Sequence, residues 1–451
     1  AGTHIGSITI NITGSTTETA SAILNASGTG ASSYTSISIS PSGGVPRTIS
    51  GNIAGYFIDL NGADNVTIDG LNTGGNSLTI SNTATGTVST IRFIADASNN
   101  TITNCTIQGS VTDGTSGVVK FSTGTVTGND NNDINHCSIT AAGTNLPIKG
   151  IYSEGTSATI DNSNNTLNTN NISDYFNATA STVGIHLSFN NSSWLITNNK
   201  LFQTATRLYT TGAAHYGIYL SGSSYNVTGN IIGFANSSGT GTTNMVGNSV
   251  PLLGSFPDAY NITGTSVSII YTGIYCVPTD FNSVSEIQGN TIAGFAMFTG
   301  SGNNNKNGVW CGIFNQFGYA NIGTTAGNII GATSGTGSVY VACTTSGALT
   351  VGIYSTSNRP ITIQNNNVGA IDAMGTTSSV CGSIMGINAG NIGDPAGYKS
   401  GNSFIYANTI GNATNPNIRM GNLTTGSFLS NIGTTFSASS GLANFNGIAD
   451  F

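Results

Sequence analysis

A recurring Gly-Ile pair constrains the fold of this chain more than any other feature. One copy opens the run Gly217-Ile-Tyr-Leu220, and a Gly/Ser turn separates this run from two further β-type runs, Asn226-Val-Thr228 and Ile231-Ile232. Successive copies begin 34, 33, 56, 39, 40, 34 and 61 residues apart. Self-similarity at periods of about 20 to 50 residues is the signature of stacked repeats, so each copy predicts one rung of a solenoid. The pairs begin at Gly150, Gly184, Gly217, Gly273, Gly312, Gly352, Gly386 and Gly447.

A second column of the repeat is held by asparagine, just before the third run. Amides stacked at the ~4.8 Å strand spacing can hydrogen-bond to one another, and Asn tolerates the left-handed backbone of a sharp bend. Asn is also abundant here, but chance would scatter it over the rung. We therefore predict an all-β fold, a right-handed parallel β-helix with asparagine ladders and irregular loops. The ladder residues are Asn170, Asn199, Asn230, Asn290, Asn328, Asn366 and Asn408.

The repeat covers most of the 451 residues, which favours a single elongated domain. Residues 1–55 lack a clear repeat and are predicted to form an N-terminal cap or first irregular rungs. Residues 56–451 are predicted to form the β-helix, with loop insertions near 236–261 and 412–440. Long loops on a rigid scaffold often carry recognition, although many only connect elements.

Charged residues make up only 6% of the chain, the net charge is −7, and the ten Lys and Arg are spread singly. No basic patch for nucleic acid or an anionic membrane is visible, and no apolar run approaches the ~18 residues of a membrane span. We therefore expect neither nucleic-acid binding nor membrane insertion. The sequence starts at Ala1 without a Met or a signal peptide, so we expect a mature or excised segment.

Four of the six cysteines are predicted to stack in pairs. Cys105 and Cys137 occupy the ladder position of two successive rungs, and Cys343 and Cys381 each follow a ladder asparagine by 15 residues. Neighbouring strands place Cα atoms ~4.8 Å apart, which a disulfide can span. Each pair is therefore predicted to be either a disulfide or two buried thiols. Disulfides would indicate an extracellular or periplasmic location.

Two stretches carry a family resemblance. Leu60-Asn-Gly-Ala-Asp-Asn-Val-Thr-Ile-Asp-Gly-Leu71 and Ile91-Arg-Phe-Ile-Ala-Asp-Ala-Ser-Asn-Asn-Thr-Ile102, with the Gly-Ile-Tyr rungs, resemble β-helix segments of very large secreted surface proteins of Bacteroidetes-type bacteria. The similarity runs over nearly the whole chain, and it implies a pectin-lyase-like β-helix exported to the cell surface. It implies no particular activity, because a fold alone does not determine function.

Catalytic carboxylates do not stand out. Enzymes on this fold need paired carboxylates for glycoside hydrolysis, or a Ca²⁺ cluster with an Arg or Lys base for elimination. Asp130 and Asp133 could donate oxygens to a cation, but the closing Glu of an EF-hand loop is missing, which favours a solvated turn. We expect no catalytic residues and no cofactor, with Ca²⁺ at these two aspartates as the weaker alternative.

The residue two positions after the anchor glycine is usually aromatic. Period-2 alternation places it on the face opposite the inward Ile, so the rings should form an outward column. Such a column could bind sugar rings or another chain, or the long loops could fold over it. Its members are Tyr152, His186, Tyr219, Tyr275, Phe314 and Tyr354.

We therefore expect a non-enzymatic structural or adhesive solenoid, secreted or at the cell surface. A new rung begins at Gly447, and the β-type segment from Thr3 to Ile12 has no visible partner before it. Two open ends predict head-to-tail stacking into a filament, and the alternative is a segment cut from a longer rod. The alternative function is a carbohydrate-binding or polysaccharide-degrading β-helix, with surface glycans as partners.

Overall fold

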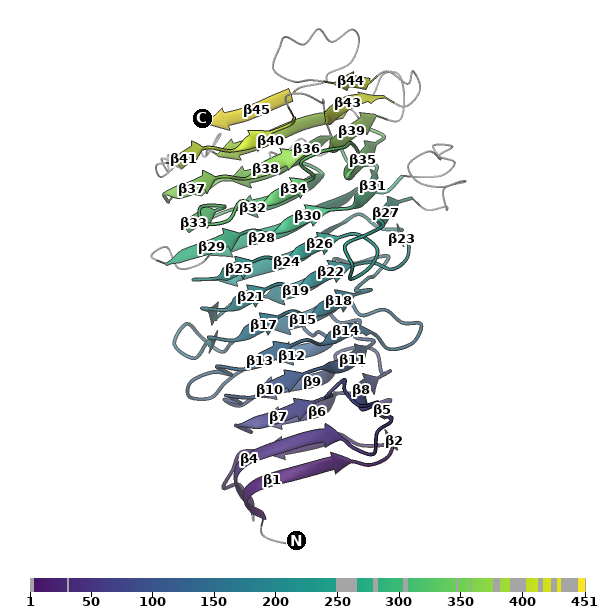
Figure 1. Cartoon of the computed structure of the whole chain (residues 1–451), viewed down its shortest axis with the longest axis vertical. Coiled ribbons are helices and arrows are strands. Elements are labelled where there is room, and N and C mark those ends of the chain that lie inside the picture. The colour runs from purple at the N-terminus through teal and green to yellow at the C-terminus, as the bar shows by residue number, and fades with distance from the viewer. Residues whose placement is uncertain are drawn as a thin grey trace. The chain divides into compact units, whose positions relative to one another are not determined.

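The computed structural model describes residues 4–30, 32–248, 266–278, 283–302, 307–345, 348–357, 359–375, 382–389, 403–412, 417–422, 428–430 and 445–450. These residues form β-strands and no helix, so the described part of the chain contains no helix that could cross a membrane. Successive strands belong in turn to sheets A, B and C, which makes the fold a parallel β-solenoid (Figure 1). Two compact units are distinguished: unit 1 is Ala1–Asn177, Val183–Lys200 and Tyr219–Asn226, and unit 2 is Ala178–Thr182, Leu201–Ile218 and Val227–Phe451.

Unit 1 contains three parallel sheets. Sheet A is β1 (His4–Ile12), β4 (Ser32–Pro41), β7 (Val66–Asp69), β10 (Thr101–Thr103), β13 (Asp133–Asn135), β17 (Thr166–Asn168) and β21 (Leu195–Thr197). Sheet B is β2 (Thr16–Glu18), β5 (Pro46–Gly51), β8 (Ser77–Asn82), β11 (Cys105–Gly109), β14 (Ser138–Ala141) and β18 (Asn171–Ser173). Sheet C is β3 (Ala22–Asn25), β6 (Tyr56–Asn61), β9 (Ser89–Ile94), β12 (Val119–Phe121), β15 (Lys149–Ser153) and β19 (Val183–Leu187). A small pair joins β16 (Asn162–Ser163) to β20 (Asn191–Ser192).

Unit 2 repeats this plan and adds a fourth sheet. Sheet A contains β29 (Val284–Gln288), β33 (Tyr319–Ile322), β37 (Ile361–Gln364) and β41 (Ser403–Tyr406). Sheet B contains β26 (Ile231–Gly233), β30 (Thr291–Ala293), β34 (Ile329–Gly331), β38 (Asn367–Gly369) and β42 (Thr409–Ile410). Sheet C contains β28 (Ile269–Pro278), β32 (Trp310–Asn315), β36 (Leu349–Ser355), β40 (Ser383–Ala389) and β45 (Phe445–Asp450). Three strands include residues of both units: β22 (Lys200–Phe202), β24 (Ala213–Gly222) and β25 (Asn226–Thr228).

The fourth sheet, sheet D, is absent from the sequence-based expectation. It contains β23 (Arg207–Tyr209), β27 (Thr243–Gly247), β31 (Phe295–Thr299), β35 (Val339–Cys343), β39 (Ile371–Gly375), β43 (Ile418–Asn422) and β44 (Phe428–Ser430). All pairs are parallel except β43 with β44. The predicted insertions 236–261 and 412–440 therefore contain strands of sheet D, and their parts 249–261, 413–416, 423–427 and 431–440 lie outside the described residues.

From His4 onward, residues 1–55 contribute strands that pair between rungs: β1 pairs with β4, with a register shift between Gly6 and Ser7, β2 pairs with β5, and β3 pairs with β6. The inward column of sheet A shows how the core is built. Ile39, Ile68, Ile102 and Ile134 follow one another in register and are buried. Aliphatic side chains stacked in this way remove apolar surface from water on every rung, which is the main stabilising term of a solenoid.

Close packing explains why the anchor positions are occupied by glycine. A Cβ on Gly312 would lie 2.6 Å from the carbonyl oxygen of Gly352 and 2.8 Å from Ile330 of sheet B, and Gly150, Gly217, Gly273 and Gly352 meet equivalent neighbours. Val118, which holds the anchor position of its rung, packs against a glycine of sheet B at a different position, two residues beyond Ile107: a Cβ on Gly109 would lie 3.0 Å from Val118. At the anchor glycines, the missing side chain therefore leaves room for the facing side chain of sheet B and for the backbone of the next rung.

Candidate functional site

The outward column on sheet C is the main candidate site, and in unit 1 it extends further than the sequence indicated. The strand register places Asp59 beside Arg92, Arg92 beside Lys120, Lys120 beside Tyr152, and Tyr152 beside His186. The sequence search found only the aromatic part, because Val119, Ile91 and Ile58 keep the inward apolar position in these rungs while the preceding glycine is replaced. The inward Ile or Val by itself, without the preceding glycine, marks the charged part of the column in the sequence.

The charged part of this column is internally paired. Arg92 donates from Nε to Asp59 Oδ1 at 2.8 Å and from Nη2 to Oδ2 at 2.6 Å, a bidentate ion pair. The guanidinium also lies 3.4 Å from the ring centroid of Tyr56, a cation–π contact. Lys120 donates from Nζ to the Thr115 carbonyl at 2.9 Å. These cations are therefore held in place rather than free in solvent.

Lys149 lies beside the column, on the same strand as Tyr152. Its Nζ lies 4.4 Å from the ring centroid of Tyr152 and donates to the Gly114 carbonyl. Burial lowers the pKa of Lys149 to about 8, partly offset by nearby carboxylates such as Asp113. The Tyr152 hydroxyl donates to Glu154, and burial followed by this hydrogen bond raises the pKa of Tyr152. Lys149 is therefore mostly protonated at pH 7, and its buried ammonium group faces the Tyr152 ring.

His186 lies edge-on between two tyrosines. Its ring centroid is 5.3 Å from that of Tyr152 and 4.7 Å from that of Tyr219. Burial, and secondarily the charge of Lys149, lower the pKa of His186 to about 3. Its Nδ1 is buried without a hydrogen-bond partner. The imidazole is therefore neutral at pH 7 and acts as a packed ring.

In unit 2 the same column is a stack of rings. Phe314 lies between Tyr275 and Tyr354, with centroids 4.9 and 4.8 Å apart and interplanar angles of 24° and 27°. Phe314 and Tyr354 also pack with Cys311 and Val351 in one buried cluster. Offset stacking of this kind favours association of rings beyond their area of burial.

The exposure of the predicted column is uneven. Tyr152, Phe314 and Tyr354 are only 3%, 8% and 5% exposed, whereas His186, Tyr219 and Tyr275 are half-buried. Three of the six rings are thus largely covered, and three retain surface that a ligand could contact. The register brings Tyr152 and His186 together in unit 1, and Tyr275, Phe314 and Tyr354 together in unit 2.

The predicted asparagine ladder is present at the bend between sheets A and B. In unit 2, Asn290 donates from its backbone N and its Nδ2 to Asn328 Oδ1, both at 2.9 Å, and Asn328 Nδ2 donates to the Ile287 carbonyl. The same pattern links Asn230 to Asn290, Asn328 to Asn366 and Asn366 to Asn408, and in unit 1 it links Asn170 to Asn199. Each side chain therefore satisfies backbone groups on two sides.

The left-handed backbone falls on the residue before the ladder position rather than on the ladder residue. Asn104, His136 and Asn198 have φ values of 55°, 52° and 56° and precede Cys105, Cys137 and Asn199. Asn and Gly adopt this conformation at little cost. This explains why a second Asn or a Gly so often precedes the ladder Asn in the sequence.

Two further ladders in unit 1 were missed by the sequence analysis. Asn100, Asn132 and Asn165 are buried and bonded in order: Asn100 Nδ2 donates to Asn132 Oδ1 at 2.9 Å, and Asn132 Nδ2 to Asn165 Oδ1 at 3.1 Å. Asn129 bonds Asn162 in the same way at 2.9 Å. Their spacing of 32 and 33 residues is visible in the sequence and could have been recognised.

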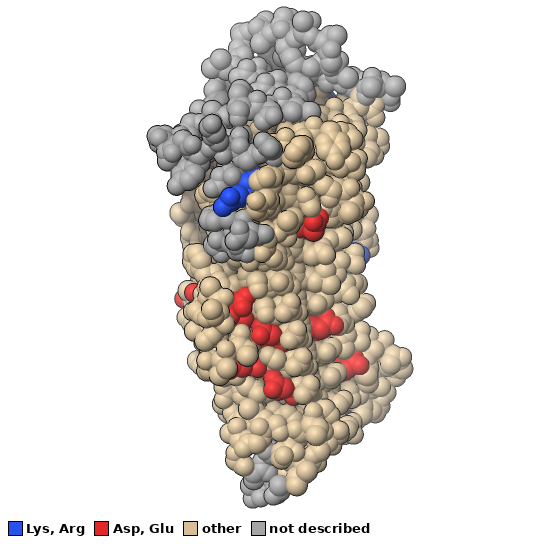
Figure 2. All heavy atoms as spheres, turned by 90° about the vertical axis from the view of Figure 1, so that its left-hand side faces the viewer, with Lys and Arg blue, Asp and Glu red and all other residues tan. Residues whose placement is uncertain are grey.

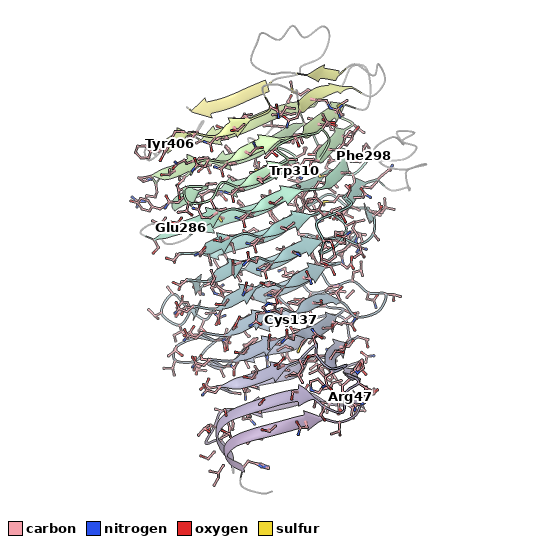
Figure 3. All side chains as sticks on the ribbon, in the orientation of Figure 1. Arg47, Cys137, Glu286, Phe298, Trp310 and Tyr406 are labelled. Atoms are coloured by element: carbon pink, nitrogen blue, oxygen red, sulfur yellow. The ribbon has the colours of Figure 1, made fainter. Side chains whose placement is uncertain are left out.

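The cysteines only partly follow expectation. Cys105 and Cys137 are buried free thiols, and Cys137 is labelled in Figure 3. A hydrogen bond with Cys137, followed by burial, raises the pKa of the Cys105 thiol. Cys343 is opposite Gly375 in the register, so its predicted stacking on Cys381 is wrong. Counting residues from the ladder failed because the connection between sheets B and D differs in length from rung to rung. Cys381 itself lies outside the described residues.

Acidic side chains gather on one face of unit 1 (Figure 2). Asp96 interacts electrostatically with Asp64 and Asp130, and Asp130 with Asp161. Burial opposes ionisation of Asp96, but hydrogen bonds from Thr125 and from the Gly128 and Val126 amides hold its pKa well below its usual value. This carboxylate thus fixes the turn at 125–128 from the neighbouring rung.

The two aspartates predicted as weak cation ligands also bond to protein. Asp130 Oδ1 accepts from the Ser163 amide at 2.7 Å, and Asp133 Oδ2 from Asn135 Nδ2 at 2.6 Å. Burial raises the pKa of both carboxyl groups. Among the residues with described positions, no group of three or more His, Cys, Asp or Glu could hold a metal ion.

Comparison with known proteins found no matching family model, no matching curated protein and no matching solved structure.

Proposed function

We propose that the chain is a non-enzymatic extracellular structural or adhesive β-solenoid that associates end to end through its first rung. The supporting observation is the inward column of sheet A. Ile10 is 40% exposed, Ile39 is 9% exposed and Ile68 is 1% exposed, so the core lies open at the first rung. Within the described part of unit 1, β1 pairs only with β4, which leaves one edge of β1 without a neighbouring strand.

The open end is also hollow. A cavity of about 680 Å³ there is lined by core side chains that include Ile10, Ile12, Leu24 and Phe57. An apolar hollow bordered by three parallel strand edges is complementary to one further rung of the same kind, because that rung would supply backbone partners and aliphatic side chains together. The proposed occupant is the last rung of a second copy. A head-to-tail contact of this kind does not close on itself and produces a filament.

The test is electron microscopy and light scattering of the purified chain over a range of concentrations. We expect filaments that lengthen with concentration. Ile10→Lys should abolish them, because an inward charge at an open strand edge blocks strand addition. The matched control is Val126→Lys, at an exposed apolar residue elsewhere in unit 1. Monomers at every concentration, or filaments that tolerate Ile10→Lys, would refute end-to-end assembly.

The resemblance to secreted surface proteins of Bacteroidetes-type bacteria supports a location at the cell surface. This location is a separate proposal. Protease treatment of intact producing cells should degrade the protein while a cytoplasmic marker survives. Protection of the protein in intact cells would contradict a surface location.

Carbohydrate binding on the outward column of sheet C is the second candidate function. It is favoured by the half-buried rings of His186 and Tyr219, whose faces could pack against sugars. Tyr219→Ala should then abolish glycan binding, whereas Tyr354→Ala should matter less because Tyr354 is largely covered. Turnover of pectin, alginate or a neutral glycan that disappears on substitution of one aspartate would instead identify an enzyme.

A further inference from the structure

Connections between sheets B and D in unit 2 alternate in length, and this alternation forms a groove. β30 ends at Ala293 and β31 begins at Phe295, so Gly294 alone connects them. The rung before uses residues 234–242 for the same connection, and the rung after uses residues 332–338. The short turn therefore lies recessed between two longer loops. In Figure 1, β27, β31 and β35 follow one another in this region.

Gly294 cannot carry a side chain. Its φ is +66°, and a Cβ would lie 2.4 Å from the ring of Phe234. Its carbonyl accepts from the amides of Phe234 and Thr243 at 3.0 and 2.8 Å, which fixes both ends of the loop 234–242. Within that loop, Asn236 Oδ1 accepts from the Ser238 amide at 2.9 Å. One wall of the groove is thus built from a hydrogen-bonded loop rather than from a loose one.

The groove has a volume of about 460 Å³, within the range of about 300–1,000 Å³ that is usual for ligand pockets. Phe295 and Ala296 lie at its base and are almost fully buried. Thr206, Thr242 and Asn244 line one side, and Tyr340 lines the other. Asn244 Nδ2 donates to Thr206 Oγ1 at 3.4 Å, a long bond that a ligand hydroxyl could replace. Phe298, labelled in Figure 3, lies further along β31 in the buried cluster that also contains Ala296 and Tyr340.

The lining carries no charged side chain, and the charged side chains nearby bond to other residues of the protein. Asp372 follows Tyr340 in register, and Arg419 Nε donates to its Oδ1 at 2.7 Å in a two-bond ion pair. Arg207, next to Thr206, donates from Nε to Gln203 Oε1 at 2.7 Å and is buried. An ionic ligand would lose its hydration without gaining an opposite charge, whereas hydroxyls and amides would find matching donors and acceptors.

We propose that this groove of unit 2, lined by Thr206, Thr242, Asn244 and Tyr340, binds a short segment of a neutral saccharide. Sugar hydroxyls both donate and accept hydrogen bonds, as the threonine hydroxyls and the Asn244 amide do. This site does not depend on end-to-end assembly, and it is separate from the outward column of sheet C. It would give an adhesive solenoid a defined class of ligand.

The test is binding of the full chain to an array of neutral and acidic oligosaccharides, followed by calorimetry with the strongest neutral oligosaccharide. We expect neutral oligosaccharides to bind and their acidic counterparts not to bind. Asn244→Leu and Thr242→Val should each weaken binding at least tenfold. The matched control Thr211→Val changes an exposed threonine of unit 2 outside the groove and should leave binding unchanged.

Absence of binding to every neutral oligosaccharide would overturn the proposal, as would equal binding of acidic ones. Binding that survives both substitutions would place the ligand elsewhere and would overturn it too. Thr242 is exposed, so Thr242→Val keeps the test valid even if Asn244→Leu does not fold. The Ile10→Lys variant should keep full saccharide affinity, which separates failure of this site from failure of the assembly proposal.

Discussion

The outward column of sheet C has the same geometry in the two units but different chemistry. In unit 2, Tyr275, Phe314 and Tyr354 stack nearly parallel and pack with Cys311 and Val351. In unit 1, the column passes from the Asp59–Arg92 ion pair through Lys120 to aromatic rings that meet edge-on. A rung determines where a side chain points, whereas the residue determines whether that position stabilises the fold or contacts solvent.

This difference assigns separate roles to the two halves of the column. In unit 2, rings stacked at 4.8 and 4.9 Å form an outward hydrophobic seam that is largely covered at Phe314 and Tyr354. Unit 1 combines cations, carboxylates and half-buried rings, which are the groups that recognition uses. If the sheet C column binds a ligand, unit 1 is therefore where we expect that ligand to bind.

The largest expected effect comes from breaking the seam in unit 2. Phe314→Ala removes the middle ring of the stack and should lower the free energy of unfolding by about 3 kcal/mol, the cost of truncating a buried aromatic. Tyr219→Ala, at the corresponding position in unit 1, should cost only about 1 kcal/mol because Tyr219 is half-buried. Urea unfolding measures both. Equal losses would show that the two halves of the column stabilise the fold alike.

A second contrast lies at the bend between sheets A and B, where two rungs of unit 1 carry the thiols of Cys105 and Cys137 and the rungs of unit 2 carry amides. Asn328→Ala leaves the Asn290 backbone amide buried without its hydrogen-bond partner and removes one of the two hydrogen bonds to the Ile287 carbonyl, so we expect a loss of about 2 kcal/mol. Cys137→Ala removes only weak S–H···O contacts, such as that to the Asn135 carbonyl at 3.2 Å, and should cost about 1 kcal/mol. Denaturation midpoints of the two variants, compared with the unmodified chain, test this order. A larger loss for Cys137→Ala would reverse our ranking of the two ladders.

The third prediction concerns acid. The pKa of His186 is about 3 in the folded state and about 6.5 when unfolded, so only the unfolded state gains a proton between these values. Stability from the neutral ring is complete above pH 6.5 and falls as the pH drops towards 3. His186 should therefore cost about 2 kcal/mol of stability between pH 7 and pH 5.

His186→Phe makes this position of unit 1 resemble unit 2 and should reduce that acid sensitivity. His215, with a pKa lowered to about 3 by burial in unit 2, retains its own share. Thermal unfolding at pH 5 and pH 7 gives the comparison, with His4→Gln as a control at an exposed histidine. An unchanged pH dependence in His186→Phe would mean that His186 is not buried as described.

The smallest effect is expected at the charged end of the column. Arg92→Lys keeps the charge but loses the bidentate bond to Asp59 and the planar contact with Tyr56, at a cost of about 1 kcal/mol or less. Added salt should lower the stability of the unmodified chain and shrink the difference from Arg92→Lys, because screening weakens the pair that is lost. A loss as large as that of Phe314→Ala would show that this ion pair is a principal support of unit 1.

The sequence determined the rung itself. Glycine is needed wherever a Cβ would collide with the next rung, as at Gly312. Asparagine is needed wherever a bend leaves backbone groups without a hydrogen-bond partner in the strands, as at Asn328. Both requirements are local and repeat at every rung, so they appear in the sequence as columns. The parallel β-solenoid, its core isoleucines and the main ladder could therefore be predicted.

The tertiary structure alone decided which columns continue and what covers them. The extension of the sheet C column to Arg92 and Asp59 and the pairing of Cys343 with Gly375 depend on strand register, which varies with the length of each connection. Sheet D escaped prediction because its middle strands β31, β35 and β39 are buried throughout and show no alternation. The groove beside Gly294 arises from a difference in length between neighbouring loops. Such differences in loop length interrupt the sequence repeat, and the groove that they produce forms only when the rungs are stacked.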